Sequence, residues 1–146
     1  YLRLSFHGFR AKDKSFNADF KLDLDEALPK MNLVPQDIGR VLLNLINNAF
    51  YAVSAKTSKT KTGDYKPRVI VSTKLDNDKL SISVKDNGNG IPDDIKDKIF
   101  QPFFTTKPSG SGIGLSLCRQ IMRQHSGSIS VSSIPKKMTS FKLVFP

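Results

Sequence analysis

The strongest pattern in this chain is an apolar stripe with helical spacing that begins just after Pro35. Pro35 suits the first turn of a helix, where its missing N–H costs nothing, and Asp37 suits the positive end of the helix dipole. Apolar residues then recur at i, i+3, i+4 and i+7 through four turns, which predicts a helix that packs one face on a sheet. The stripe consists of Ile38, Val41, Leu42, Leu45, Ile46, Ala49, Phe50 and Val53.

Alternating apolar and polar residues predict five strands, at residues 16–24, 68–75, 79–85, 128–133 and 140–145. Asp76-Asn77-Asp78 is a turn-forming trio, so the second and third strands are expected to form a hairpin. The last two strands are expected to form another. Residues 25–34 are interpreted as a connection.

A shorter apolar stripe, at Leu117, Cys118, Ile121 and Met122, predicts a second long helix that Gly127 ends. Residues 92–99 indicate a short helix. Pro102 and Pro108 break any longer one, which leaves an irregular segment able to move as a lid. Residues 1–14 follow neither period, and we interpret them as the frayed end of a preceding helix with its linker.

Composition favours one globular domain. The 146 residues are 38% hydrophobic, enough for a sizeable core, and no long apolar run or signal-peptide pattern is present. Cys118 is the single cysteine of the sequence, so no internal disulfide can form, which fits a reducing compartment. Packing in the hydrophobic core is the preferred interpretation of this residue. The net charge of +10 suggests anionic ligands. Because the basic residues are spread thinly, with the densest group in a Lys/Thr-rich loop at 54–66 that lacks aromatics, no nucleic-acid partner is expected.

Two glycine-rich runs carry the candidate chemistry. Asp86 stands at the end of a predicted strand, before Gly88 and Gly90, where a carboxylate can accept a hydrogen bond from the exocyclic amine of adenine. The second run, from Gly110 to Leu115, opens a predicted helix whose unpaired N–H groups suit phosphate oxygens. Taken singly, each run is more often an ordinary loop.

The first helix carries a polar stripe beside its apolar face. Arg40, Asn44 and Asn48 fall one turn apart, with Asn47 adjacent, so two or three amides are expected to project toward one place. Amide oxygens there could ligate Mg²⁺ carried by the phosphates of a nucleotide. A solvated polar face is the alternative interpretation of the same stripe.

Four runs in fixed order resemble the N, G1, F and G2 boxes of the catalytic ATP-binding domain of bacterial sensor histidine kinases, in the GHKL superfamily. The runs are NLINNA at 44–49, DNGNGIP at 86–92, IFQPFFTTK at 99–107 and GSGIGLSL at 110–117. The resemblance implies a two-layer α/β sandwich in which a mixed, mostly antiparallel sheet carries about three helices on one face. It also implies that ATP binds between the sheet-backed helix and a lid.

The resemblance further implies the site residues. Asn48 would ligate Mg²⁺ with help from Asn44, and Asp86 would hold the adenine amine; with Lys107, the two asparagines would be catalytic. The remaining implied contacts to ATP fall into three groups. The adenine ring would meet Gly88, Gly90 and Ile91, and the lid would contribute Phe103, Phe104, Thr105 and Lys107. The phosphates would meet Gly110, Ser111, Gly112, Ile113, Gly114 and Leu115.

The resemblance also implies a reaction and partners. ATP-hydrolysing relatives carry a glutamate base one turn before the first box asparagine, where this chain has Arg40, which cannot act as a base. A kinase is therefore expected, with its phosphoacceptor elsewhere, because neither His7 nor His125 is followed by an acidic residue. Residues 1–14 would be the tail of a dimerisation hairpin, and residues 15–146 would be the catalytic domain. The parent protein would be a homodimeric sensor whose partner is a response regulator, and this chain would belong to its cytoplasmic part.

Two alternatives remain open at this point. A serine kinase of the anti-sigma type belongs to the same superfamily and would label a hydroxyl group of a partner. An interaction module with a degenerate pocket would bind no nucleotide, and the intact boxes speak against it. No contact of the chain with a membrane is expected.

Overall fold

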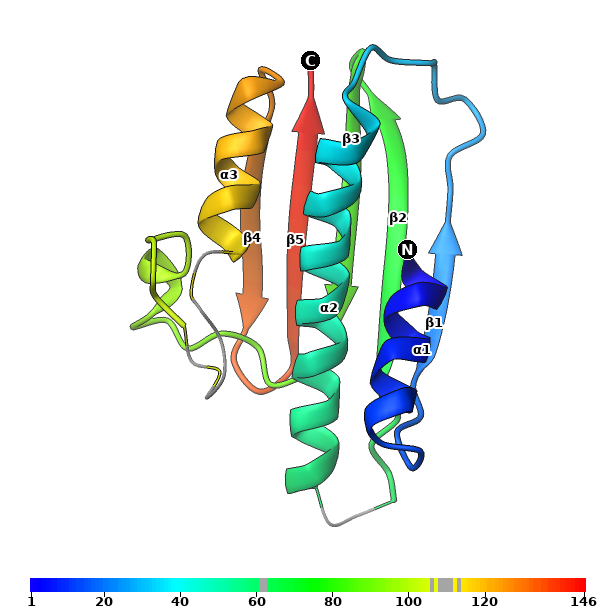
Figure 1. The fold of residues 1–146 in the computed structure, drawn as a ribbon, viewed down its shortest axis with the longest axis vertical. Helices are drawn as coiled ribbons and strands as arrows, with labels where there is room; N and C mark the ends of the chain where they lie inside the picture. Colours follow the sequence, from blue (N-terminus) through cyan, green and yellow to red (C-terminus); the bar gives the residue numbers. More distant parts are fainter. Residues whose placement is uncertain (61–62, 106, 108–111, 113) are drawn as a thin grey trace.

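The computed structural model describes residues 1–60, 63–105, 107, 112 and 114–146, and it has two layers (Figure 1). A five-stranded sheet forms one layer, with the strand order β1-β2-β3-β5-β4. The strands are β1 (Asp19–Asp23), β2 (Arg68–Asp76), β3 (Lys79–Asp86), β4 (Ser128–Ile134) and β5 (Met138–Phe145). Only β1 and β2 pair in parallel, and the other pairs are antiparallel. The mixed, mostly antiparallel sheet is thus confirmed.

The α-helices of the described residues cover one face of this sheet (Figure 1). They are α1 (Leu2–Lys12), α2 (Pro35–Lys59) and α3 (Gly114–Gln124), and a short 3₁₀ helix, η1 (Lys96–Lys98), lies within the predicted segment 92–99. The apolar stripe of α2 meets the inward side chains of the strands, so Val41, Phe50 and Val69 have no exposed surface. The predicted two-layer sandwich is confirmed in this arrangement.

The hairpin between β2 and β3 turns on Asn77 and Asp78, whose φ values are 52° and 63°. Positive φ at both positions is typical of a two-residue turn whose twist matches the strands it joins, and Asn and Asp tolerate it better than most residues. The register that follows places Asp86, at the far end of β3, opposite Val69. The turn chemistry of the sequence therefore sets where the final carboxylate of β3 lies.

Helix α2 is longer than the sequence predicts. It continues to Lys59, so the prediction that a loop begins at Ser54 was wrong. Thr57 and Ser58 donate their hydroxyl protons to the carbonyl oxygens of Val53 and Ser54, at 2.8 and 3.2 Å. The hydroxyl groups are thus satisfied within the helix, although the apolar stripe has already ended.

The segment before β1 is ordered as a helix, and the expectation of a frayed end was wrong. Leu2 and Phe6 of α1 are buried in the common hydrophobic core, together with Ser5. The Phe6 ring lies 5.0 Å from the ring of Phe20 and 5.9 Å from that of Phe50, between ring centres. The assignment of residues 1–14 to the tail of a dimerisation hairpin stays a prediction.

Candidate functional site

Asp86 ends β3 with its carboxylate turned toward the helix layer, and only 5% of the residue is exposed. Its Oδ1 accepts a hydrogen bond of 2.8 Å from the N–H of Gly88. Among the described residues no other donor bonds this carboxylate, so its second oxygen can accept a bond from a ligand. Burial raises the pKa of Asp86 from 3.8 to about 7, although the Gly88 N–H and the charge of Lys56 oppose the rise.

The raised pKa of Asp86 predicts a pH-dependent stability. The folded protein holds this proton more tightly than the unfolded chain does, so its contribution is fully present below about pH 4 and is lost as the pH rises through about 7. The loss is expected to reach up to about 4 kcal/mol. Denaturant unfolding at several pH values should show that Asp86→Asn gains stability relative to the unchanged protein as the pH rises. A constant difference across that range would contradict this.

The loop after Asp86 is wedged between α2 and the β4–β5 hairpin. A Cβ built on Gly88 would lie 2.8 Å from the carbonyl carbon of Ala52, so only glycine fits against that part of α2. Gly90 has φ 67° and faces the backbone of Ile134. Beyond it, the N–H of Ile91 donates to the Ser133 hydroxyl at 2.7 Å. These contacts fix the loop relative to α2.

Gly88→Ala is expected to destabilise the fold by about 2 kcal/mol or more, because the new methyl group meets backbone that cannot move aside. Gly8→Ala provides the control, since a Cβ at Gly8 meets nothing within 4 Å on helix α1. That change should stabilise the protein by about 0.5–1 kcal/mol through helix propensity. Thermal unfolding of both variants measures the contrast, and equal melting temperatures would refute the close packing of the loop.

The asparagines of α2 divide between two sides of the helix. Asn48 accepts a hydrogen bond at Oδ1 from the ammonium of Lys107, and Asn44 faces α3. Asn47 instead accepts a bond from the buried hydroxyl of Ser5 on α1. Two amides, not three, therefore face the predicted site.

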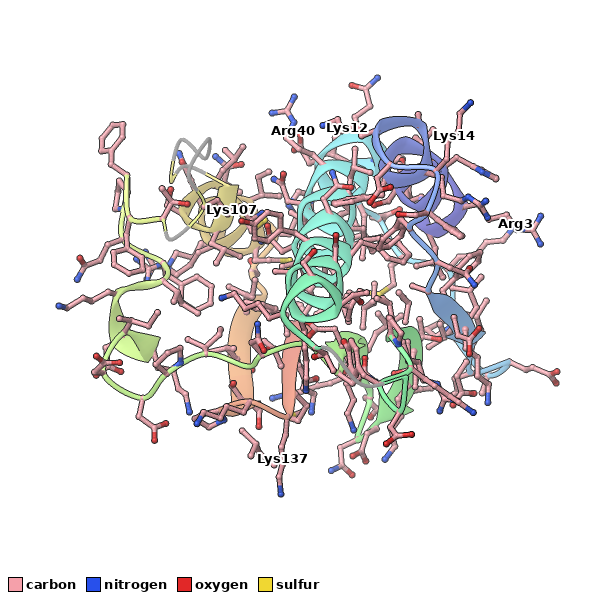
Figure 2. All side chains as sticks on the ribbon, turned by 90° about the horizontal axis from the view of Figure 1, so that it is seen from below. Arg3, Lys12, Lys14, Arg40, Lys107 and Lys137 are labelled. Carbon is pink, nitrogen blue, oxygen red and sulfur yellow. The ribbon has the colours of Figure 1, made fainter. Side chains whose placement is uncertain are left out.

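Lys107 lies between α2 and α3 (Figure 2), and its ammonium donates to the amide oxygen of Asn48. Its ammonium also sits 4.8 Å from the centre of the Tyr51 ring, and partial burial lowers its pKa. An amide oxygen that already faces a cation fits Mg²⁺. No group of three His, Cys, Asp or Glu side chains in the described residues could hold a metal. A metal here would depend on amide oxygens and on the phosphates of its ligand.

Cys118 holds the amide of Asn44. Asn44 donates from Nδ2 to the Cys118 Sγ at 3.8 Å, and this sulfur lies 3.9 Å from the carbonyl oxygen of Val41. The amide oxygen of Asn44 is then directed toward the first residue of α3, where a Cβ on Gly114 would be 3.8 Å away. Burial raises the pKa of Cys118 to about 11, so the thiol stays neutral. Core packing of Cys118 is confirmed, and the bond to Asn44 is an additional role.

The residues predicted for the lid differ in exposure. Phe104 packs against the core, whereas Phe103 is 76% exposed and has φ 68°. The N–H of Phe103 donates to the carbonyl oxygen of Gly112 at 2.8 Å, and the Thr105 hydroxyl accepts from the N–H of Lys107 at 3.0 Å. Leu115 packs on the core from the first turn of α3. The predicted phosphate contacts Gly110, Ser111 and Ile113 lie outside the described residues.

Sequence reasoning missed several residues that shape the site. Tyr51 follows Asn48 by one turn and supplies an aromatic face, and Ser133 anchors the loop after Asp86. Their signals are too weak alone: one tyrosine on a helix and one serine in a strand. His125 accepts from the N–H of Val34 at Nε2, 3.3 Å away, and its Nδ1 lies 2.9 Å from the Ile121 carbonyl oxygen. The non-catalytic interpretation of His125 agrees with these contacts.

Comparison with known proteins now identifies the family. The family model described as "Histidine kinase-, DNA gyrase B-, and HSP90-like ATPase" matches residues 33–146. This chain belongs to that family. The match spans α2, Asp86 and α3, which are the elements that build the site described above.

Curated relatives and solved structures agree with this membership. The signal transduction histidine-protein kinase AtoS of Escherichia coli is 38% identical over 129 residues, which are 88% of this chain and 20% of the relative. The sensory histidine kinase/phosphatase NtrB of Klebsiella oxytoca is 34% identical over 89% of this chain and 37% of its own length. The catalytic domain of histidine kinase ThkA superposes with a TM-score of 0.76 at 29% identity, covering 99% of this chain and 90% of that one.

The chain spans only about a fifth to two fifths of the length of these two curated relatives. It corresponds to their ATP-binding catalytic portion, and the structure matches isolated catalytic domains almost end to end. No helix in the described ranges is long and apolar enough to cross a membrane.

Proposed function

We propose that this domain binds ATP together with Mg²⁺ and transfers the γ-phosphoryl group to a histidine on a dimerisation hairpin of its parent protein. The observation that carries the proposal is the pairing of two oriented acceptors. Asp86 offers a carboxylate oxygen in a buried position, and Asn48 offers an amide oxygen that already faces a cation. The first suits the amine of adenine, and the second suits the metal that accompanies phosphates.

Each end of the nucleotide has its own support in the fold. Gly88 and Gly90 let the loop pack directly on the backbone of Ala52 and Ile134, which holds the loop in place beside the buried carboxylate of Asp86. Asn44 lies beside Gly114 at the start of α3, where the positive end of the helix dipole favours phosphate oxygens. Mg²⁺ would neutralise charge on the transferring phosphoryl group, with Asn48 and Asn44 as its ligands.

The chain's own charges favour a kinase over an efficient ATPase. Arg40 lies one turn before Asn44, is exposed on α2 and points away from the site (Figure 2). No base for activating water stands at that position. If Asn48 held the metal, Lys107 would no longer be bound to its amide, and its ammonium would be available to stabilise the negative charge of the transferring group.

The parent is proposed to be a homodimeric sensor with its kinase portion in the cytoplasm and a response regulator as the next phosphate acceptor. Support comes from the relatives AtoS and NtrB, whose names describe histidine kinases.

Incubating the domain with radiolabelled ATP and the dimerisation hairpin of its parent tests the transfer of the phosphoryl group. Acid-labile, alkali-stable label on histidine is expected. Acid-stable label on serine, or no label while ATP still binds, would contradict the histidine kinase assignment.

A further inference from the structure

No described helix or strand covers the face of the sheet that lies away from the helices (Figure 1). Side chains alternate along a strand, so the neighbours of buried Val69, Val71 and Val84 point to this other side. These neighbours are mostly serines and basic residues, and the corresponding side of β5 carries Ser140 and Lys142 between Met138 and Val144. We call this surface the open face and define it by Arg68, Lys74, Ser83, Lys85, Ser140 and Lys142.

The strand register gathers three cations on the open face, toward the end where β2 begins and β3 finishes. Lys85 stands opposite Ser140 of β5, and Lys142 stands opposite Ser83, two residues along the same two strands and on the same face. Arg68 begins the neighbouring strand β2 on this face, opposite Asp19 of the edge strand β1. Within the described part of the chain, no carboxylate forms an ion pair with any of these three cations. Their charge is therefore available to an anionic partner.

A cavity of about 490 Å³ opens beside these cations, at the end of β2 and β3. Arg68, Ile70 and Lys85 line it from the open face, and Tyr65 and Lys66 line it from the loop before β2. Tyr65 is fixed there, because its hydroxyl donates to the carbonyl oxygen of Asn87 at 3.0 Å and the Lys56 ammonium lies 4.8 Å from its ring centre. Asp64, Asp86 and Asn87 complete the lining. The cavity thus combines an apolar wall at Ile70 with a rim on which the three cations Lys66, Arg68 and Lys85 outnumber the two acidic residues.

We propose that the open face binds an acidic polypeptide segment of a partner protein. Its carboxylates pair with Arg68, Lys85 and Lys142, its polar groups meet the serine hydroxyls, and one apolar or aromatic side chain enters the cavity against Ile70. Charge complementarity favours this occupant over a basic or neutral one. The central open face carries serine hydroxyls in place of the large apolar side chains that insert into a bilayer, which favours a polypeptide over a lipid surface.

Fluorescence anisotropy with a labelled peptide tests the proposal. The probe is a short peptide of alternating glutamate and serine with one central phenylalanine. The open-face variant carries Arg68→Glu, Lys85→Glu and Lys142→Glu. The matched control carries Arg3→Glu, Lys12→Glu and Lys14→Glu, three exposed residues of α1 and the turn after it, in the helix layer (Figure 2). Each variant reverses three charges, so each lowers the net charge by six, from +10 to +4.

The open-face variant is expected to bind the peptide about tenfold more weakly and the control less than about twofold, since exposed ion pairs each contribute a small factor. Raising the salt concentration should weaken binding to the unchanged protein, and replacing the central phenylalanine by glycine should weaken it further. Affinity for an ATP analogue, measured in parallel, should change by the same small factor in both variants, because each lowers the net charge by the same amount.

Three results would overturn the proposal. The first is no binding of the peptide to the unchanged protein, and the second is an equal loss in both variants, which would mean unspecific attraction by net charge. The third is binding of phosphatidylglycerol vesicles, lost in the open-face variant, without any binding of the peptide. That result would assign the open face to an anionic membrane surface.

Discussion

Replacing Asn48 by alanine is expected to weaken the binding of a non-hydrolysable ATP analogue in the presence of Mg²⁺ by about a hundredfold, because the change removes a metal ligand. In the presence of a chelator, the variant should bind at least as tightly as the unchanged protein, because the amide then has no metal to hold. Lys107 loses its hydrogen-bond acceptor in this variant, so its ammonium is free for the phosphates. Isothermal titration at several Mg²⁺ concentrations measures both effects.

Asn47→Ala is the matched control for this experiment. It removes the same type of side chain from the same helix, but Asn47 bonds Ser5 on α1 and does not face the site. Its Mg²⁺ dependence should equal that of the unchanged protein. If Asn47→Ala abolished the Mg²⁺ dependence and Asn48→Ala preserved it, the orientation of α2 described here would be wrong.

Replacing Asp86 by asparagine is expected to weaken the binding of the adenine analogue by about a hundredfold. A loss of this size corresponds to the upper range of the binding free energy that one buried hydrogen bond to a charged group contributes. An asparagine that keeps the bond to the Gly88 N–H presents its NH₂ group to the ligand, so two donors would face each other. Affinity for the guanine analogue should not fall. The discrimination between the two bases is therefore expected to shrink with the mutation.

Asp94→Asn serves as the control, since Asp94 is exposed in the turn that follows the glycine loop. It removes the same charge close by in the sequence without touching the buried carboxylate. Equal losses in the two variants would show that net charge, and not a bond to adenine, determines the effect. Competition between adenine and guanine analogues gives the selectivity of each variant directly.

The residues of the candidate site were predictable where the signal is local. Asp86 follows from an alternating strand that ends at a glycine turn, and Asn44 and Asn48 follow from the helical period of α2. The four motif runs in their fixed order indicate the family without any knowledge of the contacts between residues. The same local reasoning could not separate Asn47 from its neighbours, because its direction depends on where α1 packs.

The parts that sequence reasoning missed depend on contacts between residues distant in the chain. Helix α1 has Leu4 exposed and Ser5 buried, which hides its period, and its burial depends on Phe16 and Phe50. The last turns of α2 carry polar residues without an apolar stripe, and their hydroxyl groups bond back to the helix. Lys107 and Tyr51 are far apart in the sequence, so no periodic pattern of residues indicates that they meet. Long-range packing overrides local preference in each case.

The most direct test of the central claim is a calorimetric titration of the unchanged domain with non-hydrolysable adenine and guanine nucleotides, each with and without Mg²⁺. The account predicts binding of the adenine form, weaker binding when Mg²⁺ is chelated, and little or no binding of the guanine form. Equal affinity for both bases, or no affinity for the adenine form in Mg²⁺, would contradict the assignment of Asp86 and Asn48 to a nucleotide site.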